Sequence, residues 1–158
     1  MSNPLPVSRQ HVTIAAPQDA RRPILKPSAV AIPFFAHSVK AGFPSPADDY
    51  VSEALDLNEH LIAHKEATFF LRASGHSMVG AGIQDGDLLV VDRSLTARHR
   101  SVVIAVVDGE FTVKRLYKRA GRIRLLAENP DFPTIEFADG QELLIWGVVT
   151  SVIHRLAP

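Results

Sequence analysis

The uneven spread of proline constrains the fold of this chain more than any other sequence feature. Six of the eleven prolines precede residue 42, and none lies between residues 47 and 129. Proline lacks a backbone N–H and biases the residue before it toward extended conformations. Residues 1–33 are therefore predicted to form an arm with little regular structure, and the chain changes character at residues 41–47.

The segment after the arm is predicted to be one mainly β domain. The whole chain has 158 residues, of which 46% are hydrophobic, and this suffices to build a core. Apolar spacing within residues 50–64 predicts one or two short helices. Asp108-Gly109 favours a tight hairpin, because both positions tolerate positive φ. The Phe34-Phe35 pair is predicted to anchor the arm to the body. The predicted strands are residues 68–73, 88–92, 101–107, 110–117, 122–127, 134–137 and 143–154.

The arm and the body carry opposite charge. Residues 1–41 hold five Lys or Arg residues against one acid, a net charge of +4. Residues 42–158 hold twelve basic and sixteen acidic residues, a net charge of −4. The two parts are expected to attract each other weakly, and salt should screen that attraction. Because the body has no basic excess, little direct DNA binding is expected.

The absence of cysteine and of a long apolar run limits the possible catalytic chemistry and the cellular location. The chain has no cysteine, which excludes disulfides, thiolate metal ligands and a cysteine nucleophile, and fits a reducing compartment. The first residues lack a long apolar run, and the apolar stretch 143–153 is too short to span a bilayer. A cytoplasmic protein without a membrane anchor is expected.

Ser77 and Lys114 form a candidate catalytic pair. A serine hydroxyl needs a base to become a nucleophile, and a neutral lysine amine can be that base. At pH 7 only about 0.04% of ordinary lysines are neutral, so we expect apolar strand neighbours to bury Lys114 and lower its pKa. Gly75 permits a sharp turn before Ser77, and N–H groups near Met78 are candidate oxyanion donors. Residue types alone do not separate this pair from a helix-capping serine and an exposed strand lysine.

Other polar residues give weaker signals. His60 and His64 lie at helical spacing without a third ligand, so solvated helix histidines are the preferred interpretation. Three acids, Asp85, Asp87 and Asp92, lack the rest of a calcium-binding loop and are predicted to shape the turn before a strand. No metal and no cofactor is predicted.

Several motifs carry a family resemblance. Residues 73–78, 82–92 and 108–116, which contain Ser77 and Lys114, resemble the LexA/UmuD group of self-cleaving serine peptidases. Residues 41–51 and 56–58 are most similar to its UmuD branch. The resemblance covers about residues 32–155, and it assigns no role to residues 1–31, a longer extension than this branch leads one to expect.

The resemblance implies a function and a site. It implies Ser77 as nucleophile, Lys114 as general base and Ala41-Gly42 as the bond cut, on a LexA-like domain of twisted antiparallel strands with short helices that forms a homodimer. Residues 1–41 would be the arm removed, and residues 42–158 the product. In this family RecA filaments on single-stranded DNA stimulate cleavage after DNA damage. The trimmed dimer then acts with a UmuC-like Y-family DNA polymerase subunit in translesion synthesis.

Three other functions compete with this interpretation. A LexA-type regulator needs a helix-turn-helix domain before the cleavage site, which forty-one proline-broken residues do not supply. A signal-peptidase-like enzyme should have a membrane anchor. The third is a non-enzymatic interaction module of the same fold, which self-cleavage at alkaline pH would exclude.

Overall fold

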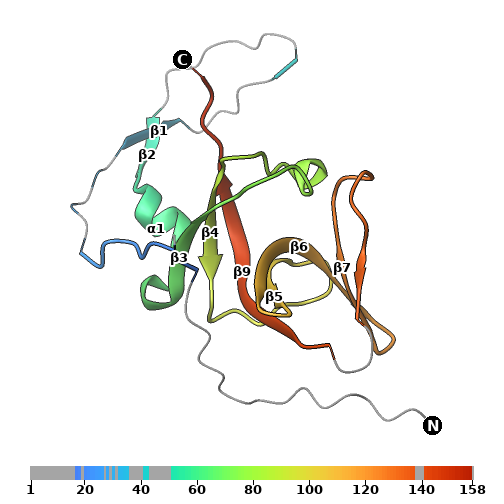
Figure 1. Cartoon of the computed structure of the whole chain (residues 1–158). Helices are drawn as coiled ribbons and strands as arrows, with labels where there is room; N and C mark the ends of the chain where they lie inside the picture. Colours follow the sequence, from blue (N-terminus) through green and yellow to red (C-terminus); the bar gives the residue numbers. More distant parts are fainter. Residues whose placement is uncertain are drawn as a thin grey trace.

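The computed structural model confirms a mainly β fold (Figure 1). It describes residues 17–18, 20–26, 28, 30, 32–35, 41–42, 51–137 and 141–157. The strands are β1 (Ile32–Phe35), β2 (Val51–Leu55), β3 (Thr68–Arg72), β4 (Leu88–Asp92), β5 (Val102–Val107), β6 (Glu110–Arg119), β7 (Arg122–Leu126), β8 (Ile135–Glu136) and β9 (Leu143–Ile153). The helices are α1 (Leu57–Leu61) and two 3₁₀ turns, η1 (Lys65–Ala67) and η2 (Val79–Ala81).

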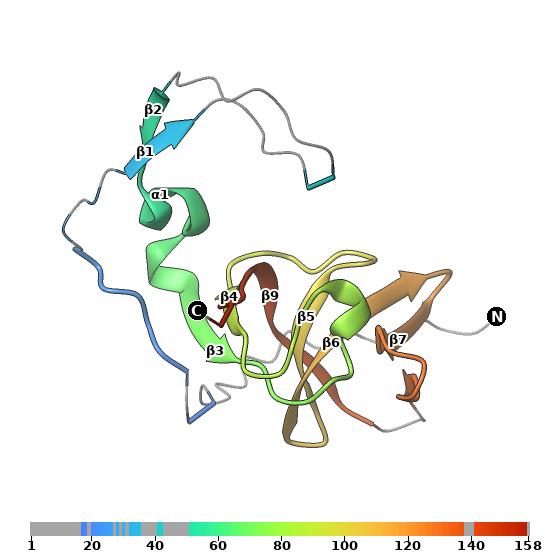
Figure 2. The same cartoon turned by 90° about the horizontal axis from the view of Figure 1, so that it is seen from above.

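Seven strands form one antiparallel sheet in the order β3-β4-β9-β5-β6-β7-β8. The last strand, β9, inserts between β4 and β5, so that it joins the first half of the body to the second. The register of β9 shifts at Val90/Val91 on one side and at Ile104/Ala105 on the other. Such bulges bend a strand and increase its twist, and the sheet curls strongly when seen from above (Figure 2).

Two clusters of buried apolar residues stabilise the curled sheet. The first includes Phe69, Leu89, Val91 and Trp146, and the Phe69 and Trp146 rings meet edge to face at 5.2 Å. The second cluster consists of Val103, Ala105, Leu116 and Leu125. Apolar burial is the main favourable contribution to folding, and these clusters hold β3, β5 and β6 at fixed positions around the loop that carries Ser77.

The Asp108-Gly109 hairpin is confirmed. β5 and β6 pair from Val107↔Glu110 outward, which leaves these two residues as the turn. Both have positive φ, 49° at Asp108 and 89° at Gly109. This is the backbone form that matches the twist of the flanking strands. The hairpin sends β6 back along β5 and fixes the position of Lys114 opposite Val103.

The prediction of helix across residues 50–64 is wrong for its first part. Residues Val51–Leu55 form β2, which pairs antiparallel with β1 through Ile32↔Leu55 and Pro33↔Ala54. The helix begins only after Asp56, whose carboxylate accepts a hydrogen bond from Asn58 N at 2.8 Å. The strand partner comes from the arm, some twenty residues earlier, and local periodicity carries no information about it.

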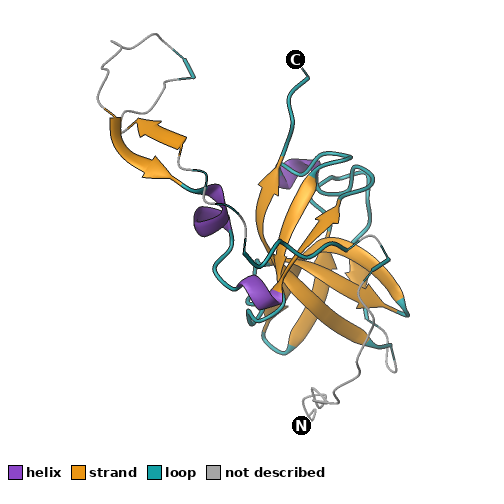
Figure 3. Ribbon diagram, turned by 90° about the vertical axis from the view of Figure 1, so that its left-hand side faces the viewer, coloured by secondary structure: helices purple, strands orange, loops and turns teal. Residues whose placement is uncertain are grey.

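The arm contains more regular structure than predicted. Phe34 and Phe35 lie in β1, and the β1–β2 pair stands away from the seven-stranded sheet (Figure 3). Phe34 is 49% exposed and so does not provide the expected anchor to the body, while the Phe35 side chain lies outside the described residues. The arm touches the body at a different place, where Arg21 forms an isolated antiparallel bridge with Phe70 of β3. Among the described residues, no helix has the length and apolar character needed to cross a membrane.

Candidate active site

The structure brings Ser77 and Lys114 together. Their side chains meet with 3.0 Å between Ser77 Oγ and Lys114 Nζ. Ser77 belongs to the loop between β3 and η2, and Lys114 to the middle of β6. The pair therefore depends on tertiary packing between two segments that lie 37 positions apart in sequence.

The Ser77 loop leaves β3 through a sharp turn. Ala73 N donates to Asp87 O at 2.8 Å, and Gly86 N donates back to Ala73 O at 2.9 Å. Gly75 follows with φ +89°, a conformation that L side chains rarely adopt, and its N–H donates to Asp85 Oδ1 at 2.7 Å. The expected glycine turn is confirmed, although it leads into a short 3₁₀ turn and not into an α-helix.

A second segment, residues 128–129, holds the loop from the other side. Glu128 N donates to Ser77 O at 2.8 Å, and Gly80 N donates to Glu128 O at 2.7 Å. Asn129 Nδ2 donates to His76 O at 2.9 Å. No sequence pattern marked this segment, because it lies in an irregular stretch about fifty residues downstream of Ser77. Three hydrogen bonds thus fix the backbone on both sides of the hydroxyl.

Lys114 is nearly buried and is surrounded by acceptors. It exposes 8% of its surface. Its Nζ lies 3.0 Å from Thr112 Oγ1 and 3.1 Å from the carbonyl oxygen of Val113, in addition to Ser77 Oγ. Burial lowers the pKa of Lys114 from its ordinary value of 10.5, as the sequence predicted, because an apolar environment disfavours the charged amine.

This geometry suits a neutral lysine that acts as a base. A neutral amine has two N–H donors and one lone pair. With the donors on Thr112 Oγ1 and Val113 O, the lone pair faces Ser77 Oγ and can accept the hydroxyl proton. The N–H groups of Ser77 and Met78 donate no hydrogen bond to any described residue. They are free to bind an oxyanion that forms beside Ser77.

A cleft of about 680 Å³ opens over the pair. Its walls come from the end of β3 with the residues that follow it, from the first half of β6, and from Pro17 and Gln18 of the arm. Ala41 and Gly42 are exposed and are not among the residues that line the cleft. The structure therefore places the predicted bond outside the site, and cleavage at Ala41-Gly42 stays a prediction.

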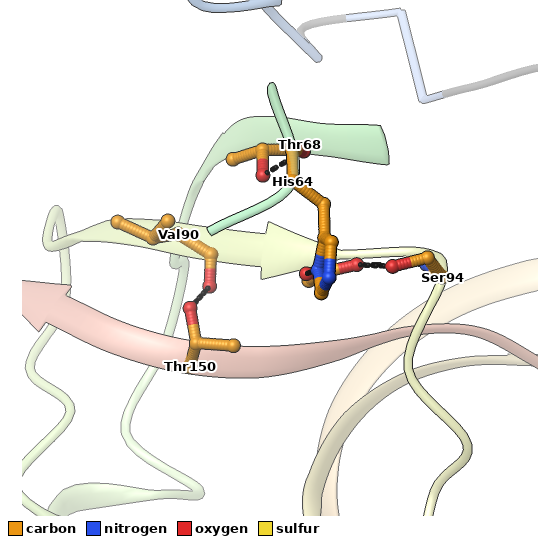
Figure 4. A network of polar contacts seen from close by, with 6 residues as sticks. His64, Thr68, Val90, Ser94 and Thr150 are labelled. Carbon is orange, nitrogen blue, oxygen red and sulfur yellow. Dashed lines mark hydrogen bonds and ion pairs between the residues drawn. The ribbon is translucent and has the colours of Figure 1, made fainter. Parts of the chain in front are cut away.

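A separate polar network that includes His64 and Ser94 lies at the end of β4 (Figure 4), where both residues contact Asp92. His64 Nδ1 and Ser94 Oγ each lie 2.6 Å from an Asp92 carboxylate oxygen. Burial raises the pKa of Asp92, but the hydrogen bonds from Ser94 and His64 outweigh burial and leave this pKa below its ordinary value. His64 lies beyond α1 and pairs with an acid, so its expected role as a solvated helix histidine is wrong. In the same view Thr150 Oγ1 donates to Val90 O at 3.3 Å, which ties β9 to β4.

The acids before β4 shape a turn, as predicted. Asp87 Oδ2 accepts from Gln84 N at 2.7 Å, and Asp87 Oδ1 lies 2.6 Å from His154 Nδ1. The Gln84 and His154 hydrogen bonds lower the pKa of Asp87. Asp92 does not belong to this turn, since it lies at the other end of the strand. Within the described part of the chain, no three His, Asp or Glu side chains gather closely enough to hold a metal ion.

Several known proteins are similar in sequence to most of this chain. The model of the Peptidase S24-like family matches residues 33–150. Protein ImpA of Escherichia coli is 52% identical over 124 residues, which are 78% of this chain and 83% of ImpA. Protein MucA of Salmonella typhimurium is 51% identical over 76% of this chain and 82% of MucA. LexA repressor 2 of Geobacter sulfurreducens is 40% identical over 75% of this chain and 58% of the repressor.

Proposed function

Because the chain belongs to the S24-like peptidase family, as a serine peptidase of the LexA/UmuD type, we propose that it cleaves its own Ala41-Gly42 bond. Ser77 is the nucleophile and Lys114 the general base. The observation that carries this proposal is the buried Lys114 Nζ at 3.0 Å from Ser77 Oγ, at the base of an open cleft.

The reaction proceeds in two halves. Neutral Lys114 accepts the Ser77 hydroxyl proton while Ser77 Oγ attacks the carbonyl carbon of Ala41, and the N–H groups of Ser77 and Met78 stabilise the oxyanion. Protonated Lys114 gives its proton to the Gly42 nitrogen as the peptide bond breaks, which leaves an ester between Ser77 and Ala41. Lys114 then takes a proton from water, the hydroxide breaks the ester, and the proton returns to Ser77. The products are residues 1–41 and residues 42–158.

The proposed biological role is that of a UmuD-like protein in SOS mutagenesis. RecA filaments on single-stranded DNA stimulate the cleavage in the cytoplasm, and the trimmed homodimer joins a UmuC-like Y-family polymerase subunit in translesion DNA synthesis. Similarity over most of the length of ImpA supports this role over that of a LexA-type regulator. The matched region is 83% of ImpA but 58% of LexA repressor 2.

Incubation of the purified full chain at alkaline pH tests the proposed chemistry. We expect two fragments that meet at Ala41-Gly42, and no fragments from Ser77→Ala or Lys114→Ala. Lys118→Ala is the matched control, because Lys118 lies on the same strand but is exposed, and this variant should cleave normally. An intact wild-type chain under all these conditions would identify a non-enzymatic interaction module instead.

A mixing experiment separates cleavage within a chain from cleavage between chains. One chain carries Ser77→Ala and the other carries a blocked bond, Gly42→Pro. Fragments in the mixture can arise only when the active site of one chain cuts the bond of another.

A further inference from the structure

The arm of this chain is docked on the free edge of β3. Arg21 N donates to Phe70 O at 3.0 Å, and Phe70 N donates to Arg21 O at 2.7 Å. In the seven-stranded sheet β3 is the terminal strand, with β4 on its other side. Backbone groups at such an edge are open to pairing with another extended segment. Figure 1 draws the docked segment in blue beside β3.

Side chains add to this backbone pairing. The Arg22 guanidinium lies 5.0 Å from the centre of the Phe69 ring, within the range of a cation–π interaction. Ala20 packs against the cluster that contains Phe69, and Pro23 is buried. Contacts of three kinds on both sides of Arg21 indicate a docked segment and not a single chance bridge.

The docked segment enters the catalytic cleft. It runs antiparallel to β3, so residues before Arg21 lie beside the residues that follow β3, in the direction of Ser77. Pro17 and Gln18 accordingly line the same cleft as Ser74, Ser77 and Lys114. An extended peptide that presents its carbonyl to Ser77 would bind by adding a strand at an exposed sheet edge, and the edge beside this cleft is already paired.

We propose that the docked segment, described at residues 17–18 and 20–23, occupies the peptide-binding edge of the active site and competes there with the segment around Ala41-Gly42. This rests on the proposed self-cleavage. The segment belongs to the extension for which the family resemblance gives no role. Cleavage then requires two events, departure of the docked segment and entry of the bond. The observed rate is the intrinsic rate multiplied by the fraction of molecules whose cleft is open.

Proline at position 21 tests the proposal in the full chain. Arg21→Pro removes the N–H that donates to Phe70 O, whereas Arg21→Ala keeps this N–H and removes an exposed side chain whose Nη1 makes one long contact, 3.5 Å, with Gln18 O. Loss of one backbone hydrogen bond should raise the cleavage rate roughly fivefold, and Arg21→Ala should have a smaller effect. Ser28→Pro, an equal change at an exposed position outside the docked segment, should cleave like the wild type. Equal rates in all four chains would overturn the proposal.

A second measurement does not depend on cleavage. In a Ser77→Ala background, hydrogen exchange of the Phe70 amide should quicken with Arg21→Pro, because this amide donates to Arg21 O, while exchange in β4 stays unchanged. Unchanged Phe70 exchange would overturn the docking itself. Quickened exchange in the Arg21→Pro variant, combined with a wild-type chain that never cleaves, would instead overturn the proposed peptidase function and leave the docked segment without a competitor.

Discussion

Lys114 Nζ lies 3.0 Å from Ser77 Oγ, and Lys114 forms no ion pair with any described residue. A buried amine with only neutral acceptors around it has no opposite charge to offset the cost of its own charge. Burial therefore lowers the pKa of Lys114, and the same burial suits this lysine to the proposed role of base.

The rate of self-cleavage should rise with pH and then level off below pH 10.5. The lowered pKa of Lys114 means that the amine loses its proton before an exposed lysine would, and only the neutral amine takes the Ser77 proton. Initial rates between pH 6 and 11 measure this midpoint. A flat profile over that range would contradict a titrating lysine.

Lys114→Met should change how stability depends on pH. The folded pKa lies below the unfolded value, so the folded state binds fewer protons, and wild-type stability should rise with pH between the two values. The slope for one proton is at most about 1.4 kcal/mol per pH unit. Urea unfolding of Ser77→Ala with and without Lys114→Met gives the difference. If the free energy of unfolding varied with pH in the same way in both chains, Lys114 would have the same pKa in the folded and unfolded states.

Thr112→Val should slow cleavage by about fivefold, the usual effect of one lost hydrogen bond. The hydroxyl 3.0 Å from Lys114 Nζ orients the amine so that its lone pair faces Ser77. It also accepts from the charged amine, so its loss should move the midpoint of the pH profile further down. Thr112→Ser, which keeps the hydroxyl, should restore both the rate and the midpoint. A slower rate in both variants would indicate a packing defect.

Gly80→Ala should lower the plateau rate by tenfold or more without moving the pH midpoint. A Cβ at Gly80 would lie 2.4 Å from the Glu128 carbonyl oxygen, far inside contact distance, so the Ser77 loop would shift. Misplacement of a reacting group by about 1 Å can cost about a hundredfold in rate. Rates should be compared at equal folded fraction, measured by tryptophan fluorescence. Wild-type cleavage by the variant would show that residues 128–129 do not position the loop.

Local sequence patterns predicted the parts of the fold that depend on near neighbours. The Asp108-Gly109 turn and the strands around it follow from turn chemistry and from β-prone runs, and the burial of Lys114 follows from its position in such a strand. The family motifs, not residue chemistry, singled out Ser77 from the other serines. Only the structure shows that Ser77 Oγ and Lys114 Nζ lie 3.0 Å apart.

The remaining features depend on partners that are distant in sequence. Val51–Leu55 is a strand because β1 pairs with it, the Ser77 loop is held by residues 128–129, and Arg21 docks on Phe70. Most of these contacts are made through backbone N–H and C=O groups, which nearly every residue type carries. Residue type therefore gave no signal for them, and tertiary context overrode the helical spacing of residues 50–64.

In the proposed reaction, the β1–β2 pair would make hydrolysis and release two separate events. The Ala41-Gly42 bond lies between these strands, so before cleavage the two are tethered and meet at the high effective concentration of one chain. The proposed hydrolysis would cut the tether but none of the hydrogen bonds between the strands. Fragment 1–41 would then remain as a bound ligand, which dilution should remove and excess fragment should restore. A cleaved protein would thus keep the β1–β2 pairing of the intact chain until fragment 1–41 dissociates.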